Sequence, residues 1–167
     1  MTRLLARWRV CLGFVFAAIV MGLATPTRNS LWLGAAIALT GECLRLWASG
    51  HLEKSREVTR SGPYRHTRHP LYLGSSIIGV GIAVASHQPM VAVMVVGYLL
   101  LTLTAAMRSE EAHLREKFGD AYDAYAEKRA APMDRLFSWS RAVGNREHHT
   151  MVGLATGLAL LALKSVF

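Results

Sequence analysis

The sequence predicts an all-α fold, a polytopic transmembrane helix bundle with four to five spans, and three observations carry this prediction. Of the 167 residues, 52% are hydrophobic and only 18% are charged, against about 25% charged in an average soluble domain. The apolar residues fall in long blocks, on the scale of the roughly 30 Å hydrocarbon core of a bilayer. The basic residues concentrate in alternate connections between these blocks. We therefore treat residues 1–167 as a single membrane domain rather than a soluble globule, a disordered chain or a disulfide scaffold.

Four apolar blocks predict spanning helices, at about residues 10–24, 31–49, 71–86 and 90–107. At 1.5 Å per residue the second and fourth cover about 27–28 Å, which is enough to span. The first and third cover about 22–24 Å and need flanking interfacial residues or local thinning of the bilayer. An uncleaved first span is favoured over a signal peptide, because no clean small-residue cleavage site follows it.

The rest of the chain divides into a soluble-looking stretch and an apolar tail. Residues 109–149 are predicted as a cytoplasmic helical segment, whose first half is rich in helix formers until Gly119 interrupts it as a C-cap would. Phe118, Tyr122 and Tyr125 then place aromatic rings on one face, which we interpret as packing against the membrane surface or the other cytoplasmic loop. The tail, 151–163, forms either a fifth span or a helix in the membrane interface. Because it is apolar all round, we favour the span.

The Lys and Arg residues predict the orientation of these spans. Three precede the first span, one lies in the next connection, five lie between the second and third spans, none lies in the following turn, and eight lie between residues 108 and 146. This alternation places both ends of a four-span bundle in the cytoplasm, and predicts an integral, multi-pass protein in a lipid bilayer. Topology and anionic lipid account for the net charge of +8. We expect no nucleic-acid partner, because no nucleic-acid motif accompanies the charge.

The cysteine and histidine residues predict neither a disulfide framework nor a metal site. Cys11 and Cys43 lie inside apolar blocks, where we expect buried small hydrophobic side chains. The pair His66 and His69, and the run Glu147-His148-His149, lack a supporting cluster of Cys or carboxylate ligands. We therefore expect no metal cofactor.

Residues 61–74, Ser-Gly-Pro-Tyr-Arg-His-Thr-Arg-His-Pro-Leu-Tyr-Leu-Gly, form the most informative segment. Gly-Pro marks a turn, and Pro70 sits at the predicted first turn of the third span, where its missing N–H has no helical partner to lose. The free backbone N–H groups at that helix start, with the basic residues before it, form a corner that can receive an anion. Gly74 removes a side chain where something must approach the backbone closely. On composition alone, a basic turn that grips lipid phosphate is the alternative.

This segment, together with features before and after it, resembles the isoprenylcysteine carboxyl methyltransferase and phospholipid methyltransferase superfamily. The other features are Arg45–Leu52 at the end of the second span, the Glu110-Glu111 pair, and Phe118-Gly119 followed by two tyrosines and Pro132. The resemblance covers residues 41–132. It implies a membrane enzyme that binds S-adenosylmethionine in a cytoplasm-facing cofactor pocket, formed by the region before the third span and the helix after the fourth.

The resemblance also implies which residues contact S-adenosylmethionine. Carried over position by position, they are Val58 within the adenosine-side segment 56–59, Tyr64, His69, Pro70, Leu71, Tyr72, Glu110 and Glu111. The residue types suit this cofactor, since Glu110 fits a cationic part and the helix start with His69 fits a carboxylate. Tyrosine rings offer faces to the adenine or the sulfonium. Methyl transfer is an in-line displacement, so we expect positioning by the protein to dominate catalysis.

The methyl acceptor is less defined, and we expect a lipophilic small molecule or a lipid. In the prenylcysteine enzymes an arginine one helical turn before the acidic pair reads the substrate carboxylate, whereas Ala106 stands there in this chain. Arg108 lies nearby on another helix face. Glu42 and Arg45 stand at i and i+3 inside an apolar helix, where they can pair and where charges are usually functional. We expect either a structural ion pair or, together with Arg108, a catalytic set that reads or deprotonates the acceptor.

Two other functions stay open from the sequence. A membrane reductase of related fold would bind NADPH instead, although the acidic pair at 110–111 argues against it. A non-catalytic membrane scaffold would keep the bundle and bind neither cofactor. The acceptor atom, whether carboxylate oxygen, amine nitrogen or thiol sulfur, also stays open.

Overall fold

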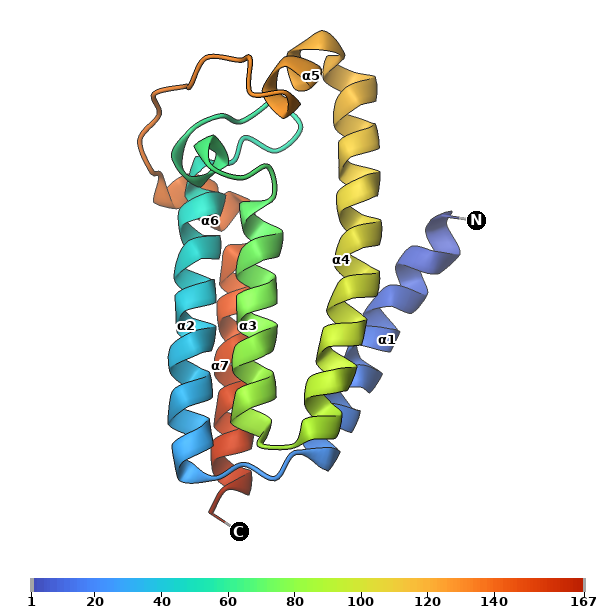
Figure 1. Cartoon of the computed structure of the whole chain (residues 1–167), viewed down its shortest axis with the longest axis vertical. Coiled ribbons are helices and arrows are strands. Elements are labelled where there is room, and N and C mark those ends of the chain that lie inside the picture. Colours follow the sequence, from blue (N-terminus) through green and yellow to red (C-terminus); the bar gives the residue numbers. More distant parts are fainter. Residues whose placement is uncertain (1, 167) are drawn as a thin grey trace.

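The computed structural model describes residues 2–166, with side chains from residue 13 onward, and every regular element in this range is a helix (Figure 1). The all-α prediction is therefore confirmed for the described residues. The elements are α1 (Thr2–Leu23), α2 (Arg28–His51), the 3-10 helix η1 (Gly62–Arg65), α3 (Pro70–Ser86), α4 (Pro89–Phe118), α5 (Asp120–Ala126), α6 (Trp139–Gly144) and α7 (Glu147–Lys164).

Local sequence signals set the helix boundaries. Thr27 and Ser30 form a reciprocal capping box before α2: the Ser30 N–H donates to Thr27 Oγ1 at 3.2 Å, and the Thr27 N–H donates to Ser30 Oγ at 3.0 Å. α3 starts at Pro70 and α4 at Pro89, where proline leaves no helical hydrogen bond unmade. α4 ends at Gly119, whose φ of +48° favours glycine. The predicted start at Pro70 and stop at Gly119 are both confirmed.

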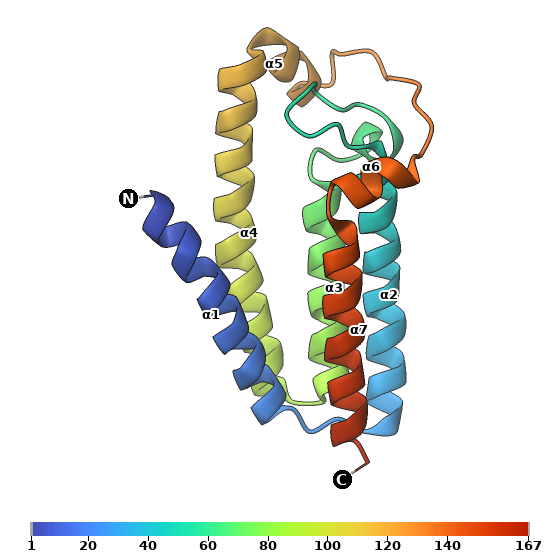
Figure 2. The same cartoon turned by 180° about the vertical axis from the view of Figure 1, so that it is seen from behind.

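Three helices form the compact part of the bundle. α2, α3 and α7 run side by side along its length, as Figures 1 and 2 show from opposite sides. α4 joins α3 through a short turn and then leans away from it, while α1 packs against the first half of α4 (Figure 1). α5, α6 and the long connections gather at the end of the bundle where α4 stands apart from α3. Connections from distant parts of the chain therefore meet at this end of the bundle.

Glycine residues bring α2 and α3 into backbone contact. A Cβ added at Gly34 would lie 2.4 Å from Gly81 O, and one added at Gly81 would lie 2.5 Å from Ala38 N. Gly74 follows the same pattern, since its Cβ would lie 2.8 Å from Gly41 O. The close approach predicted at Gly74 is confirmed, and the partner that approaches is α2. Small residues at such positions allow helices to pack closely without a large apolar side chain between them.

Many apolar side chains of the bundle face outward. α2 and α4 are long and apolar enough to cross a bilayer, and α3 and the segment Gly13–Leu23 of α1 are apolar but shorter. Less than a third of the apolar window of each long helix is buried inside the protein. Large exposed apolar patches of this kind mark contact with lipid or with another protein. Exposed large apolar side chains occur on each long helix, among them Phe14, Trp32, Leu33, Val93, Leu101 and Val152.

Three expectations about this region need correction or refinement. α4 does not stop at the predicted span end, residue 107, but continues unbroken to Phe118, because the residues that follow are good helix formers. Cys43 is exposed on the outer face of α2 rather than buried, and the side chain of Cys11 lies outside the described residues. The apolar tail forms α7, which packs lengthwise beside α2 as a further helix of the bundle.

Candidate active site

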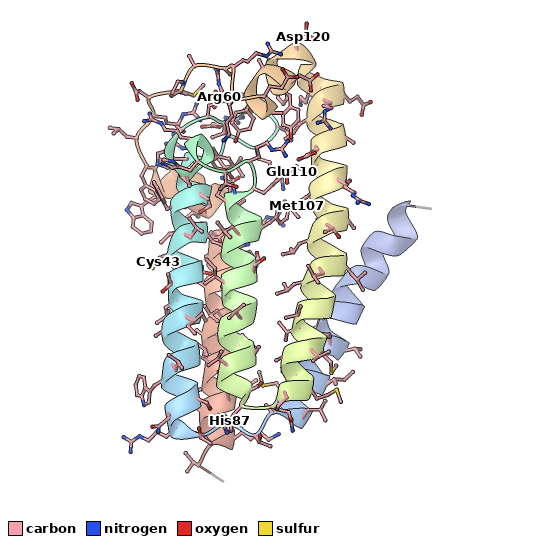
Figure 3. The ribbon with its side chains drawn as sticks, in the orientation of Figure 1. Cys43, Arg60, His87, Met107, Glu110 and Asp120 are labelled. Atoms are coloured by element: carbon pink, nitrogen blue, oxygen red, sulfur yellow. The ribbon has the colours of Figure 1, made fainter. Side chains whose placement is uncertain are left out.

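The predicted pocket corresponds to a cavity of about 530 Å³ at the end of the bundle where α4 stands apart from α3. Its wall is made by the connection after α2, by η1, by the start of α3, by the far part of α4 and by α5, and it is closed by the residues that precede and begin α7. Figure 3 shows Glu110 on α4 level with these connections, with Met107 below it. Three stretches of the chain, residues 45–72, 106–125 and 145–147, thus meet around one space.

Most of the predicted site residues line this cavity. From the predicted cofactor set, the structure brings together Val58, Tyr64, Leu71, Tyr72 and Glu110. Arg45 of the predicted catalytic set also lines it, and so does Ala106, which stands where the resemblance implies an arginine. Tyr64 of the Gly-Pro-Tyr segment, the start of α3 and Glu110 of the acidic pair therefore line a single cavity.

His69, Glu111 and Pro70 do not line the cavity. His69 Nε2 lies 2.8 Å from Glu111 Oε1, and Arg68 Nη1 lies 3.4 Å from the same oxygen, so these contacts tie the start of α3 to α4. Glu111 lies beyond the apolar part of α4, and the hydrogen bond from His69 holds the pKa of its carboxyl below the ordinary value. Pro70 is fully buried at the first turn of α3. These residues hold the two helices in position relative to each other.

Arg45 pairs with an acidic residue that the sequence analysis did not single out for the site. Its Nε lies 2.7 Å from Glu147 Oε1, and Glu147, at the start of α7, is 4% exposed and lines the cavity. The predicted ion pair between Glu42 and Arg45 is therefore wrong. Glu42 is buried one helical turn from Arg45 but accepts no hydrogen bond from it, because the guanidinium is oriented toward α7. Glu42 does not line the cavity, and Arg108 is exposed and lines no cavity wall.

Four tyrosines line the cavity, and two of them, Tyr64 and Tyr125, are joined by a hydrogen bond. The Tyr125 hydroxyl donates to the Tyr64 carbonyl at 2.9 Å and ties α5 to η1. Burial, together with the nearby Glu110 carboxylate, raises the pKa of Tyr64 well above its usual range, and burial raises the pKa of Tyr125 to about 12. Both phenols keep their protons at physiological pH and offer hydrogen-bond donors and ring faces rather than a base. Tyr125 of the predicted aromatic stripe does pack against the other connection, and Tyr122 and Tyr125 also line the cavity.

A second, apolar space adjoins the cavity between α3 and α4. This groove, of about 330 Å³, is lined by Thr67, His69, Tyr72, Leu73, Ser76, Leu99, Leu100, Leu103, Thr104 and Met107. Tyr72 lines both spaces, so the polar cavity and the apolar groove meet at this side chain. The groove runs along the apolar part of α4, and the cavity opens among polar connections. The site therefore has a water side and an apolar side.

The structure adds site residues that sequence reasoning missed. Glu147 and Asn145 both line the cavity, and the Asn145 amide donates to the carbonyls of Ser49 and Leu52 at 2.9 Å each, which fixes the end of α2. Only Glu147 carried a usable signal, as an acidic residue beside an apolar segment. Among the described residues, no group of three or more His, Cys, Asp or Glu side chains gathers to hold a metal ion.

Comparison with known proteins agrees with the geometry of the site. The family model of the phospholipid methyltransferases matches residues 8–121, which is more than half of the chain and includes segment 61–74 and the Glu110-Glu111 pair. No solved structure matches the chain significantly.

Two curated relatives resemble the chain more distantly. The nickel-cobalt-cadmium resistance protein NccN of Alcaligenes xylosoxydans xylosoxydans is 29% identical over 77% of this chain and 63% of its own length. The cobalt-zinc-cadmium resistance protein CzcN of Cupriavidus metallidurans is 30% identical over 77% of this chain and 62% of its own length. The chain thus spans less than two thirds of each relative. On the match over residues 8–121, the chain belongs to the phospholipid methyltransferase family, within the isoprenylcysteine carboxyl methyltransferase-like superfamily.

Proposed function

We propose that this protein is an S-adenosylmethionine-dependent methyltransferase that acts at the membrane interface on a lipophilic or lipid acceptor. The family supports methyl transfer in general. The observation that carries the finer proposal is the meeting of a polar cavity and an apolar groove at Tyr72. A water-soluble donor and a membrane-embedded acceptor can then approach one another from opposite sides of the same side chain.

The residues of the cavity suit S-adenosylmethionine. A volume of about 530 Å³ falls within the usual range of small-molecule sites, about 300–1,000 Å³. Glu110 supplies a carboxylate for a cationic part of the ligand, and Tyr64 and Tyr72 supply ring faces. When bound, the cofactor supplies an activated methyl group on a sulfonium sulfur. The protein's part is to hold that group in line with the acceptor, which can contribute up to about 7–11 kcal/mol through orientation.

The groove suits an apolar acceptor. Leucine side chains of α3 and α4 line it at the depth of the apolar part of α4, where an acyl or prenyl chain would lie beside them. The predicted acceptor roles of Glu42, Arg45 and Arg108 stay predictions. The geometry favours Arg108 least, since its side chain is exposed and lies outside both the groove and the cavity.

The same proposal fixes the orientation of the protein. The two most basic segments, 52–69 and 108–146, lie at the same end of the bundle, around the cavity (Figure 1). The positive-inside bias then places the cavity on the cytoplasmic side of a multi-pass bundle, with α1 to α4 and α7 as its spans. Cytoplasmic S-adenosylmethionine would reach the cavity without crossing the bilayer.

Calorimetric titration of the purified protein in detergent tests this proposal, with S-adenosylmethionine, S-adenosylhomocysteine and NADPH as ligands. We expect saturable binding of the first two and none of the third. Glu110→Gln should weaken binding of S-adenosylmethionine, whereas Glu116→Gln, on the same helix but outside the cavity wall, should leave it unchanged. Binding of NADPH alone would replace the proposal with a reductase. Folded protein that binds none of the three would replace it with a scaffold.

A further inference from the structure

Arg45 and Glu147 form the floor of the cavity, and more carboxyl groups lie at or next to this floor than the one arginine can satisfy. A guanidinium has five N–H donors. Those of Arg45 donate to Glu147 Oε1 at 2.7 Å, Glu147 Oε2 at 3.2 Å, Thr150 Oγ1 at 3.1 Å, the Leu71 carbonyl at 3.2 Å and Ser75 Oγ at 2.6 Å. Every donor of Arg45 is therefore in use, and none remains for another carboxyl group.

Glu42 is that other carboxyl group. Its side chain lies one turn along α2 from Arg45 and is 6% exposed, and neither carboxyl oxygen has a hydrogen-bond partner among the described residues. The charged groups that face it are Arg45 on its own helix and Glu147 on α7, and α3 carries no titratable side chain between Leu73 and Ser86. An ionised carboxylate buried without a partner is so costly that such a group takes up a proton instead. Two carboxyl groups thus share one guanidinium.

We propose that the cavity floor is a proton-linked subsite for a positively charged group of the ligand. Glu42 carries a proton when the subsite is empty, and it releases that proton to water when a cation binds beside Glu147 and Arg45. The O–H bond of Glu42 breaks with its electron pair left on the carboxylate, and a water molecule takes up the proton. Two negative and two positive charges then face one another at the floor.

The proposed function identifies this cation as the sulfonium of S-adenosylmethionine, and the inference rests on that function. The transferable methyl group must face the acceptor, and the acceptor approaches from the membrane side. Arg45 donates to the Leu71 carbonyl and to Ser75 Oγ, so the floor lies at the turn of α3 that carries Tyr72, where the cavity meets the groove. The sulfonium carries a fixed positive charge, and the sulfur of S-adenosylhomocysteine carries none. The ammonium group, by contrast, is present in both ligands.

Proton release on binding tests the subsite directly. The heat of binding at pH 7 is measured in two buffers with different ionisation enthalpies, and the difference gives the number of protons released. For the unaltered protein we expect S-adenosylmethionine to release up to about one proton more than S-adenosylhomocysteine does. Glu42→Gln should abolish this excess. Thr150→Val, which removes one hydrogen bond to Arg45 and no charge, should retain it.

Each outcome of this titration decides the inference. Equal release with both ligands that is lost in Glu42→Gln would support the subsite with the ammonium as its cation. Proton release that Glu42→Gln leaves unchanged would overturn it while leaving the proposed function intact. Absence of S-adenosylmethionine binding would overturn both. Because glutamine resembles a protonated glutamate, Glu42→Gln should also unfold within a few degrees of the unaltered protein, and a large drop in its Tm would contradict a protonated Glu42.

Discussion

α3 meets its two neighbours, α2 and α4, in opposite ways. Against α2 it packs backbone to backbone, so that a Cβ added at Gly41 would lie 2.7 Å from Gly74 O. Against α4 it leaves a groove of about 330 Å³ that apolar side chains line. One face of α3 is therefore closed by contacts that admit no side chain, and the other is open at the depth of the membrane.

The two faces of α3 therefore have different roles: the face against α2 supports the site, and the face against α4 gives ligands access to it. The segment that carries the first motif leads into α3, and the close contact with α2 holds α3 and the Arg45–Glu147 pair in place. The opposite face and α4 form the walls that ligands would contact. A site built on rigid elements keeps its geometry while one side stays open. The following experiments break the closed side or narrow the open one, from the largest expected effect to the smallest.

Adding one methyl group to the closed side should destabilise the fold most. In Gly81→Ala the new Cβ would lie 2.5 Å from Ala38 N and 2.6 Å from Gly34 O, so the helices must move apart. We expect a loss of about 3 kcal/mol in the free energy of unfolding, at the upper end of the range for overpacking. The control is Gly97→Ala on α4, where nothing lies within 4 Å of the new Cβ. Thermal unfolding in detergent measures both, and equal Tm values would contradict the close contact.

Removing Tyr72, the side chain that lines both the cavity and the groove, should have the second-largest effect, a loss of affinity for S-adenosylmethionine. Tyr72→Leu deletes the ring that lines the cavity and the groove. We expect binding of S-adenosylmethionine to weaken at least about 30-fold, or about 2 kcal/mol, with little change in Tm. Tyr72→Phe keeps the ring and should retain most of the affinity. Near-normal affinity of Tyr72→Leu in calorimetry would remove Tyr72 from the cofactor site.

Filling the groove should separate access of the acceptor from binding of the cofactor. Leu103→Trp places a larger side chain in the groove, and we expect turnover of a lipophilic acceptor to fall about 10-fold, or about 1.4 kcal/mol. The affinity for S-adenosylmethionine should stay within a factor of about two of its original value. Leu101→Trp on the exposed face of α4 is the matched control and should leave turnover unchanged. If the two variants lose turnover equally, the groove is not the route of the acceptor.

The contact between His69 and Glu111 should give the smallest effect, a pH dependence of stability. Since the hydrogen bond from His69 lowers the pKa of Glu111 in the folded protein, this carboxylate stabilises the fold above its ordinary value of 4.5, and the contribution is lost as the pH falls through the lowered value. We expect less than about 1 kcal/mol, because salt and water screen a partly exposed pair. Glu111→Gln should lower the loss of Tm between pH 6 and pH 3.5. An unchanged pH profile would exclude this contribution.

Sequence patterns were sufficient to predict those features of the fold that depend on residues within one short segment. Pro70 and Gly119 mark the ends of helices through their own backbone chemistry, and these boundaries agree with the structure. The motif residues Tyr64, Leu71, Tyr72 and Glu110 line one cavity because short segments around the starts and ends of helices carry them. The apolar blocks located the long helices for the same reason, since hydrophobic periodicity is read along a single segment.

Contacts between distant segments could not be predicted in this way. The pairing of Arg45 with Glu147 joins residues 102 positions apart and exists only because α7 packs lengthwise on α2. The i, i+3 spacing instead favoured Glu42 as the partner of Arg45, since a sequence shows the neighbours on the same helix and not those on another. The sequence analysis treated the fourth span and the helical segment after it as separate elements, whereas the structure joins them without a break in α4.

The central claim, a site reached from water on one side and from the membrane on the other, is tested most directly by methyl transfer. Purified protein would be reconstituted into lipids extracted from cells that produce it, and supplied with S-adenosylmethionine labelled on its methyl group. We expect the label to appear in the organic-extractable fraction, and to appear far more slowly with Glu110→Gln or Leu103→Trp. Protein that binds S-adenosylmethionine but leaves the organic fraction unlabelled, or transfers label equally well in both variants, would contradict the account.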